Sequence, residues 1–241
     1  MIVGAQRCGT TYLYRLLDEH PEIEMAKPLR PEPKFFLDDE RYARGPTFYE
    51  AEYFSEPTAR LRGEKGTSYL ESEIAAQRIK AMLPGVTVVA LLRDPVARAI
   101  SNYRFSVQHG NEHLPLDEAL RASAAGERAW DPERFSVSPY AYLARGRYAD
   151  ALERFSRCVP REQIEVVFFE ELVAGDALPM LYERLGVTPA FTPEALGRPA
   201  NASDGIAPPL EPQLELWLRD YYREPNQRLA TLLARPLPWQ Q

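Results

Sequence analysis

The chain has 241 residues, of which 45% are hydrophobic and 27% are charged, and its formal net charge is −6. A chain of this size and composition buries a core of its own, so we expect one domain over residues 1–241. The excess of acidic residues argues against a nucleic-acid-binding surface, and no apolar run approaches the roughly 20 residues that a membrane span needs.

The chain has two cysteines and three histidines, which offer little for a disulfide framework or a metal site. Cys8 and Cys158 lie far apart, and His109 and His113 flank a Gly-Asn pair that favours a turn. We expect no signal peptide before the first strand. These features predict a cytoplasmic protein without a bound metal.

Residues 2–19 have the pattern of a strand, a glycine-bounded loop and a helix. Residues 2–3 are typical of a buried strand, residues 4–9 of a tight loop, and a helix with leucines on one face begins at Thr10. Such a loop directs backbone N–H groups and the positive end of a helix at one point. The pattern therefore favours a phosphate site.

The loop nearly matches the phosphate-binding loop of nucleoside triphosphatases, Gly-x-x-x-x-Gly-Lys-Ser/Thr. Gly4 and Gly9 have the correct spacing, but Thr10 and Thr11 follow without the lysine, and the cation of the loop is Arg7. We therefore predict a phosphate site that lacks the usual metal–triphosphate apparatus.

The same residues resemble the 5′-phosphosulfate loop of sulfotransferases that use 3′-phosphoadenosine 5′-phosphosulfate (PAPS). Arg7 stands where that family usually has a lysine, and Cys8, Gly9, Thr10 and Thr11 follow in the family pattern. The resemblance implies that the N–H groups of the loop, with Thr10 and Thr11, hold the 5′-phosphate. It also implies that Arg7 offsets negative charge on the transferring group.

Residues 27–54 are rich in aromatic and charged side chains and begin with three closely spaced prolines, so we expect a long functional loop. Within it, Glu32-Pro33-Lys34-Phe35-Phe36 resembles the Glu-x-His/Lys-Phe-Phe segment of glycan-type sulfotransferases, which are related to the heparan sulfate enzymes. The resemblance implies that Glu32 is the catalytic base. His20, Asp38 and Glu64 are the alternative bases.

Residues 61–69, LRGEKGTSY, indicate a strand edge that enters a glycine-containing loop. They resemble the Glu-Lys-Thr-Pro-x-Tyr segment of the same family, with Gly66 inserted where a threonine is expected. The resemblance implies that Lys65 reaches toward the transferring sulfuryl group. Ser72 is then expected to cap a helix.

A further segment of resemblance covers residues 86–105. Apolar and β-branched residues from 86 to 92 predict a central parallel strand, and Asp94-Pro95 predicts the start of a helix. Arg93 is thus expected at the carboxyl end of a strand, where open α/β sheets bind ligands. Arg93 and Ser101 match the arginine and the serine that hold the 3′-phosphate of PAPS in this family.

The remaining sequence predicts more helices and one more strand. Helices are expected near residues 116–120, 148–159, 178–185, 214–222 and 226–233, and a buried strand over residues 164–169. Prolines between 189 and 212 predict an irregular loop. In relatives a loop at this place closes over the 3′-phosphate end of PAPS, and Arg198 and Asn201 are candidates for that contact.

These segments predict a single α/β domain with a central, mainly parallel sheet flanked by helices and a P-loop-like strand–loop–helix at its start. The resemblance implies a soluble, bacterial-like member of the glycan-type branch that uses PAPS without a metal and yields adenosine 3′,5′-bisphosphate (PAP). Its acceptor is expected to be a hydroxyl, or second an amine, of a small metabolite, glycoside or saccharide, as in natural-product or saccharide sulfation. Two alternatives stay open: an ATP-dependent kinase, and a nucleotide-binding protein without turnover.

Overall fold

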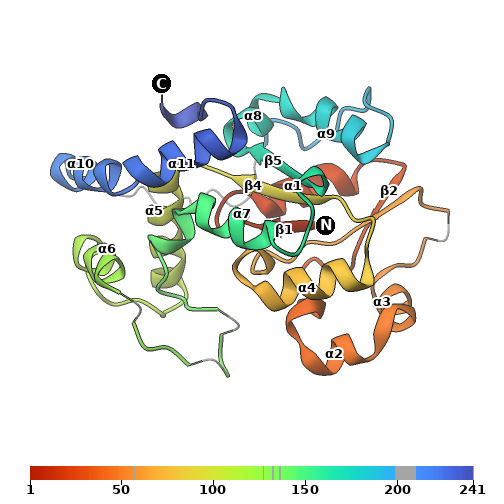
Figure 1. Cartoon of the computed structure of the whole chain (residues 1–241), viewed down its shortest axis with the longest axis horizontal. Coiled ribbons are helices and arrows are strands. Elements are labelled where there is room, and N and C mark those ends of the chain that lie inside the picture. Colours follow the sequence, from red (N-terminus) through yellow and green to blue (C-terminus); the bar gives the residue numbers. More distant parts are fainter. Residues whose placement is uncertain (57, 127, 132, 136, 199–209, 241) are drawn as a thin grey trace. The chain divides into compact units, whose positions relative to one another are not determined.

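The computed structural model (Figure 1) describes residues 1–56, 58–126, 128–131, 133–135, 137–198 and 210–240. The chain divides into two compact units. The first comprises Met1–Leu92 and Arg154–Ala200, and the second comprises Arg93–Glu153 and Asn201–Gln241. The expectation of one domain over residues 1–241 stays a prediction.

A parallel sheet forms the centre of the first unit. Its three strands are β1 (Ile2–Gly4), β4 (Val88–Leu92) and β5 (Ile164–Phe168), in the order β1-β4-β5. β4 is the middle strand and is buried along its whole length, as its run of apolar residues predicts. A second parallel pair consists of β2 (Ile23–Met25) and β3 (Leu61–Gly63). After β3 the chain continues alongside β1, through a bridge between Ile2 and Lys65.

Helices flank this sheet, which confirms the predicted α/β class. Those of the first unit are α1 (Thr10–Asp18), α2 (Asp39–Ala43), α3 (Gly45–Tyr53), α4 (Glu73–Met82), α8 (Phe169–Ala174) and α9 (Ala177–Leu185), and α7 (Tyr148–Ser156) crosses into it from the second unit. α1 packs against β1 and β2, and α8 packs against β5. In the view of Figure 1, α8 and α9 lie on the β5 side of the sheet and α4 lies on the β1 side.

Single turns of 3₁₀ helix connect several of these elements. They are η1 (Phe35–Leu37), η2 (Tyr69–Glu71), η3 (Ala144–Gly146), η4 (Arg161–Gln163) and η5 (Pro238–Gln240).

The predicted long loop over residues 27–54 was wrong in its second half, which forms α2 and α3. The three prolines at positions 28, 31 and 33 keep residues 27–33 outside helices and strands, but they do not prevent helices after that segment. Asp38 then accepts a hydrogen bond from the N–H of Arg41 at 2.9 Å and caps α2. Pro46 lies in the first turn of α3, where a missing N–H is tolerated.

Two predicted helix caps are confirmed. The Ser72 hydroxyl accepts a hydrogen bond from the N–H of Ala75 at 3.1 Å, at the start of α4. The Asp94 carboxylate accepts one from the N–H of Val96 at 3.0 Å, at the start of the next helix in the sequence. Each cap satisfies one of the N–H groups that a helix leaves without an internal partner.

The second unit is helical. Its helices are α5 (Pro95–Gln108), α6 (Leu116–Ala125), α10 (Pro212–Tyr221) and α11 (Arg223–Leu233). Apolar residues from α5, α6 and α10, from residues 142–143 and from the junction of α10 and α11 share one core. It consists of Val96, Ala99, Ala119, Leu120, Tyr142, Leu143, Leu214, Leu218 and Tyr222. This core fixes α10 against α5.

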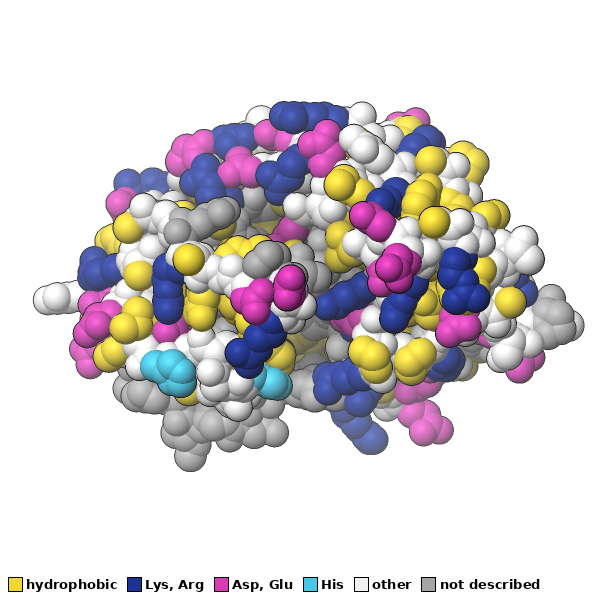
Figure 2. Space-filling model, turned by 90° about the horizontal axis from the view of Figure 1, so that it is seen from below, with side chains coloured by type: hydrophobic (Ala, Val, Ile, Leu, Met, Phe, Trp, Pro, Cys, Tyr) yellow, Lys and Arg dark blue, Asp and Glu magenta, His cyan; other side chains and the backbone are white. Residues whose placement is uncertain are grey.

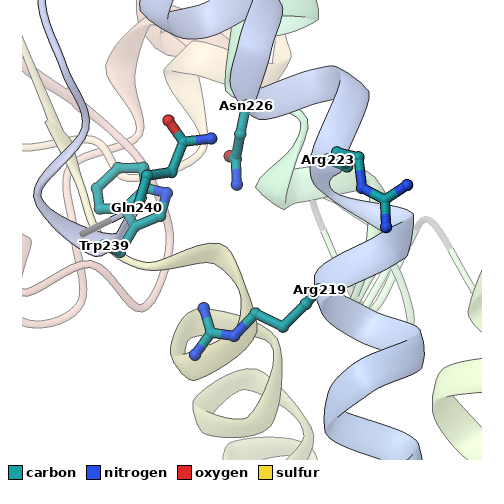
Figure 3. A pocket seen from close by; sticks show the side chains of 5 residues that line it. All are labelled: Arg219, Arg223, Asn226, Trp239 and Gln240. Atoms are coloured by element: carbon teal, nitrogen blue, oxygen red, sulfur yellow. The ribbon is translucent and has the colours of Figure 1, made fainter.

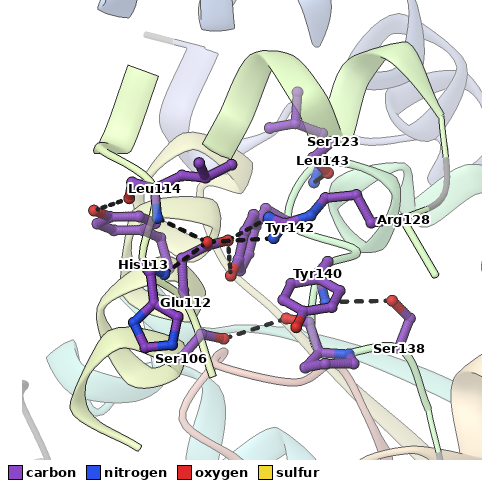
Figure 4. Close-up of polar contacts among 12 residues, drawn as sticks. Ser106, Glu112, His113, Leu114, Ser123, Arg128, Ser138, Tyr140, Tyr142 and Leu143 are labelled. Carbon is purple, nitrogen blue, oxygen red and sulfur yellow. Dashed lines mark hydrogen bonds and ion pairs between the residues drawn. The ribbon is translucent and has the colours of Figure 1, made fainter. Parts of the chain in front are cut away.

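A buried carboxylate holds the connection between α5 and α6 (Figure 4). Glu112 accepts hydrogen bonds from the N–H groups of His113 and Leu114, from the hydroxyl of Tyr142 and from the guanidinium of Arg128. Burial opposes ionisation of Glu112, but these donors prevail and lower its pKa below the ordinary value. The segment between these helices is thereby tied to the core through a satisfied charge.

No helix in the described ranges is long and apolar enough to cross a membrane. Figure 2 shows basic and acidic side chains interspersed on the face that it presents. A face of mixed sign gives no uniform positive field toward a nucleic acid.

Candidate active site

The loop after β1 is tight and is held to the neighbouring strand. Its entry is fixed by a hydrogen bond of 2.8 Å from the N–H of Ala5 to the carbonyl of Leu91 in β4. Gly9 ends the loop with a φ of 89°, in the left-handed region. A Cβ at Gly9 would lie 2.5 Å from the ring of Phe169, so both the backbone and the packing require glycine there.

The helix that follows begins without a side-chain cap. Gly9 is the N-cap residue. Its carbonyl accepts hydrogen bonds from the N–H groups of Tyr12 at 2.9 Å and Leu13 at 3.0 Å. The N–H groups of Thr10 and Thr11 precede them, at the positive end of the helix. This arrangement suits the phosphate that the sequence predicts.

The other loop residues lie as follows. Cys8 is fully buried, its Sγ lies 3.9 Å from the carbonyl of Gln6, and its N–H donates to the carbonyl of Ala5 at 3.2 Å. Arg7 has a φ of 66° and is half-buried. The amide of Gln6 donates to the hydroxyl of Ser68 at 2.9 Å, which ties the loop to the turn that follows Lys65.

The structure brings Glu32 and Lys65 into direct contact. The Lys65 ammonium donates to Oε1 of Glu32, and only 3% of the Lys65 side chain and 16% of the Glu32 side chain are exposed. Thr67 supplies two more donors: its N–H lies 3.0 Å from Oε2, and its hydroxyl lies within 3.1 Å of both carboxylate oxygens. Lys65 and Thr67 therefore fix the carboxylate in position.

Lys65 is presented by the strand-like segment beside β1. The N–H of Ile2 donates to the carbonyl of Glu64 at 2.8 Å, and the N–H of Gly66 donates to the carbonyl of Ile2 at 2.9 Å. These bonds place Lys65 next to the strand that leads into the phosphate loop. The ring of Tyr69 explains the inserted Gly66, because an added Cβ would lie 2.1 Å from that ring.

Glu64, the residue before Lys65, carries a buried carboxyl group. Glu64 is 1% exposed and accepts hydrogen bonds from the hydroxyls of Tyr49 in α3 and Tyr69 in η2. Burial raises the pKa of Glu64 to about 7, although both tyrosine hydroxyls act against this shift. Phe36 packs edge-on against Tyr69 at 5.6 Å, so the segment after Glu32 joins the same cluster.

The three alternative bases all have structural partners. The ring of His20 is buried, and it contacts the carbonyl of Thr188 at 3.0 Å and the N–H of Glu22 at 3.1 Å. Asp38 caps α2, and Glu64 accepts hydrogen bonds from the hydroxyls of Tyr49 and Tyr69. Glu32, in contrast, is half-buried and contacts Lys65, a cation that the sequence places in the site.

Arg93 and Ser101 belong to the second unit. Arg93 directly follows β4, as predicted, and its carbonyl accepts a hydrogen bond from the buried hydroxyl of Tyr148 at 2.8 Å. Ser101 lies in α5 and is 9% exposed. Of the predicted loop contacts, Arg198 is exposed in the first unit, and Asn201 lies outside the described residues.

Sequence reasoning missed Thr67. The resemblance expects a threonine directly after the lysine, and Gly66 occupies that place. The structure shows the next hydroxyl residue, Thr67, on the Glu32 carboxylate. A displaced Thr beside an inserted glycine was the signal that could have found it.

The described residues of the second unit also line an open pocket of about 620 Å³. Its walls come from α10, α11 and the final turn: Arg219, Arg223, Asn226, Trp239 and Gln240 (Figure 3). None of the site residues predicted from the sequence is among them. Within the described ranges, no cluster of histidine, cysteine or acidic side chains is arranged to hold a metal ion.

The sequence has parallels in known proteins. A family model described as a sulfotransferase domain matches residues 1–175. The chain is 27% identical over 267 residues to the human bifunctional heparan sulfate N-deacetylase/N-sulfotransferase 3, and this match covers 99% of the chain and 30% of that protein. The mouse N-deacetylase/N-sulfotransferase 4 matches with 27% identity over 270 residues, with the same coverage of 99% and 30%. The chain thus spans about 30% of the length of these relatives.

Solved structures extend the likeness to the fold. A sulfotransferase from Alicyclobacillus acidocaldarius superposes with a TM-score of 0.79 and 28% identity, over 100% of this chain and 97% of that one. The sulfotransferase domain of the curacin biosynthetic pathway superposes with a TM-score of 0.51 and 17% identity, over 98% of this chain and 97% of that one. At that identity the second likeness concerns the fold alone.

Proposed function

Because this chain belongs to the sulfotransferase domain family, we propose that it moves a sulfuryl group from PAPS to an acceptor hydroxyl or amine. The observation that carries the proposal is the contact of Glu32 with Lys65 and Thr67, next to the strand that enters the phosphate loop. A base and a cation held side by side suit a transfer in which an acceptor loses a proton while negative charge develops on a leaving phosphate.

The residues of the first unit fit a phosphate-bearing donor. The loop bounded by Gly4 and Gly9 leads into a helix with no side-chain cap, which leaves the N–H groups of Thr10 and Thr11 for a 5′-phosphate. In the proposal Arg7 lies beside this phosphate, and the N–H group of Gly9 completes the cradle, since the N–H of Cys8 donates to the carbonyl of Ala5 at 3.2 Å. Bound PAPS supplies an activated sulfuryl group on a good leaving phosphate.

The two reacting side chains have separate roles. Glu32 accepts the proton of the acceptor group as its oxygen or nitrogen bonds to sulfur and the sulfur–oxygen bond to the 5′-phosphate breaks. The Lys65 ammonium stabilises the charge that develops on the oxygens at the breaking bond, and Arg7 adds a second cation. Thr67 keeps the carboxylate oriented while Lys65 turns from Glu32 to the transferring group.

The 3′-phosphate is assigned to the second unit in this proposal. Arg93 offers a forked, permanently charged donor and Ser101 a hydroxyl, which is the combination that the family resemblance implies. The product is then PAP.

For the acceptor, we propose a hydroxyl of a small metabolite, glycoside or saccharide. The human and mouse relatives are named bifunctional heparan sulfate N-deacetylase/N-sulfotransferases, so an amino sugar is the second acceptor class to test. Labelled PAPS offered with matched panels of alcohols, glycosides and amino sugars separates the two classes.

Glu32→Gln tests the proposed chemistry because it keeps the size of the side chain and removes its basicity. Turnover should fall at least about a hundredfold, while the affinity for PAP measured by calorimetry stays nearly unchanged. Glu40→Gln, an exposed carboxylate of α2, is the matched control and should behave as the wild type. Near-normal turnover of Glu32→Gln would show that the base lies elsewhere.

Thermal shift separates the rival functions. PAP at a hundred times its dissociation constant should stabilise the protein by about 2.7 kcal/mol. A kinase would instead be stabilised by ATP with Mg²⁺ and would transfer phosphate. A protein that binds PAP but shows no transfer to any acceptor class would be the non-catalytic alternative.

A further inference from the structure

Arg93 lies in a short turn whose backbone is restrained on both sides. On one side the hydroxyl of Tyr148 donates to the Arg93 carbonyl at 2.8 Å. On the other, Asp94 has a φ of −42° and a ψ of 116°, outside the helical region, and its carboxylate holds the N–H of Val96 at 3.0 Å. Asp94 is thus both the residue next to Arg93 and the cap of α5.

Arg219 of α10 holds that carboxylate. Its Nη1 lies 3.0 Å from both oxygens of Asp94, and its Nη2 lies 3.3 Å from Glu215 one turn earlier. Only 16% of the Asp94 side chain is exposed, so the pair is partly shielded from water. In Figure 3 the Arg219 side chain extends toward α5, whereas the side chain of Arg223, one turn later, points to the other side.

The helix that carries Arg219 is held by its buried leucines. Leu214 and Leu218, on the same helix, are buried in one core with Val96 and Ala99 of α5. The guanidinium therefore reaches Asp94 from a helix that is already packed against the helix that Asp94 caps.

Asp94 also poses an electrostatic problem for the residue beside it. In the proposed function, Arg93 binds a 3′-phosphate, and a carboxylate on the adjacent residue would repel that phosphate. Arg219 offsets the charge of Asp94 from the side of α10.

We propose that Arg219 is a positioning residue that acts through Asp94 to favour binding of the 3′-phosphate at Arg93. The inference rests on the proposed assignment of Arg93 to that phosphate. It gives a C-terminal helix a role in the recognition of the nucleotide, with no direct contact between Arg219 and the ligand.

The test compares PAP with adenosine 5′-monophosphate, which lacks only the 3′-phosphate. Calorimetry of both ligands gives a selectivity ratio for wild type, Arg219→Ala, Arg219→Lys and the control Arg223→Ala. We expect Arg219→Ala to weaken PAP about threefold to tenfold, as loss of a partly exposed ion pair does, and to leave the monophosphate unchanged. Arg219→Lys should fall between, and Arg223→Ala should match the wild type. At saturating PAPS, turnover by Arg219→Ala should stay within about twofold of wild type.

Asp94→Asn tests whether Arg219 acts through Asp94, because asparagine keeps the helix cap and removes the charge. In this background, Arg219→Ala should have little further effect on the selectivity ratio. An undiminished effect would mean that Arg219 contacts the phosphate directly, and the positioning role would be wrong. If Arg219→Ala does not fold, Arg219→Lys and Asp94→Asn carry the same comparison.

Arg93→Ala separates this inference from the proposed function. If Arg93→Ala lowers the ratio and Arg219→Ala does not, the positioning role is overturned and the assignment of Arg93 stands. If Arg93→Ala leaves the ratio unchanged, the 3′-phosphate is bound elsewhere and both assignments fall.

Discussion

At Glu32 the decisive feature is that donors on two sides fix one carboxylate. Lys65 offsets its charge, and the N–H and hydroxyl of Thr67 fix its plane. Sequence resemblance named Glu32 and Lys65 separately, from two segments that are not adjacent in the sequence. It did not predict that the two side chains touch, because Glu32 lies in an irregular segment whose path depends on tertiary packing.

Thr67→Val tests the orienting role, since valine keeps the shape of threonine and removes the hydroxyl. Loss of one hydrogen bond to a charged group should lower turnover roughly tenfold to a hundredfold. The affinity for PAP should stay the same, and Thr67→Ser should restore most of the rate. Equal rates for the valine and serine variants would show that the Thr67 N–H alone orients Glu32.

The buried carboxyl of Glu64 makes stability depend on pH. Its pKa is raised from 4.5 to about 7, mainly by burial, so the folded state holds its proton more tightly than the unfolded state. The stability that this group contributes is fully present below the unfolded value and is lost as pH rises through about 7.

Glu64→Gln is neutral at every pH and so isolates this effect. Relative to the glutamine variant, the wild type should lose melting temperature between about pH 5 and about pH 8. Groups that titrate in both proteins cancel in the difference. A difference that stays flat over this range would mean that the proton on Glu64 is not linked to folding.

Among the elements, the phosphate loop was the most predictable from sequence. Its glycines and helix start are local signals, and the structure shows β1, the loop and α1 where the pattern placed them. The helices α2 and α3 were missed because the prolines before them dominated the local pattern. Their caps, Asp38 and Pro46, were visible in the sequence but were outweighed.

Gly9→Ala tests the packing of the loop. A left-handed backbone at alanine costs about 1–2 kcal/mol of folding free energy. The added Cβ would also lie 2.5 Å from the ring of Phe169. Gly45→Ala is the matched control, since Gly45 has a φ of 79° and no atom within 4 Å of its added Cβ. Gly9→Ala should therefore lower the urea midpoint clearly more than Gly45→Ala does. Equal losses would show that Phe169 moves aside without cost.

At the scale of the whole molecule, the proposed reaction uses the positive charges of two side chains. In the proposed function, Arg7 and Lys65 offset charge on the transferring group, a role that a metal ion has in many other enzymes. Sulfuryl transfer should accordingly survive exhaustive treatment with EDTA, measured as product formed from labelled PAPS. Loss of activity that returns with Mg²⁺ would contradict this prediction and favour the kinase.

The division into two units also has a consequence for how the protein is made. Neither unit is continuous in the sequence: β4 needs β5, which lies more than seventy residues later, and the core beside α5 needs Leu214 and Leu218 of α10. A ribosome releases these partners late, so the first strands and α5 leave the exit tunnel before the segments that cover them. Completion of both units must therefore wait until nearly the whole chain has been synthesised.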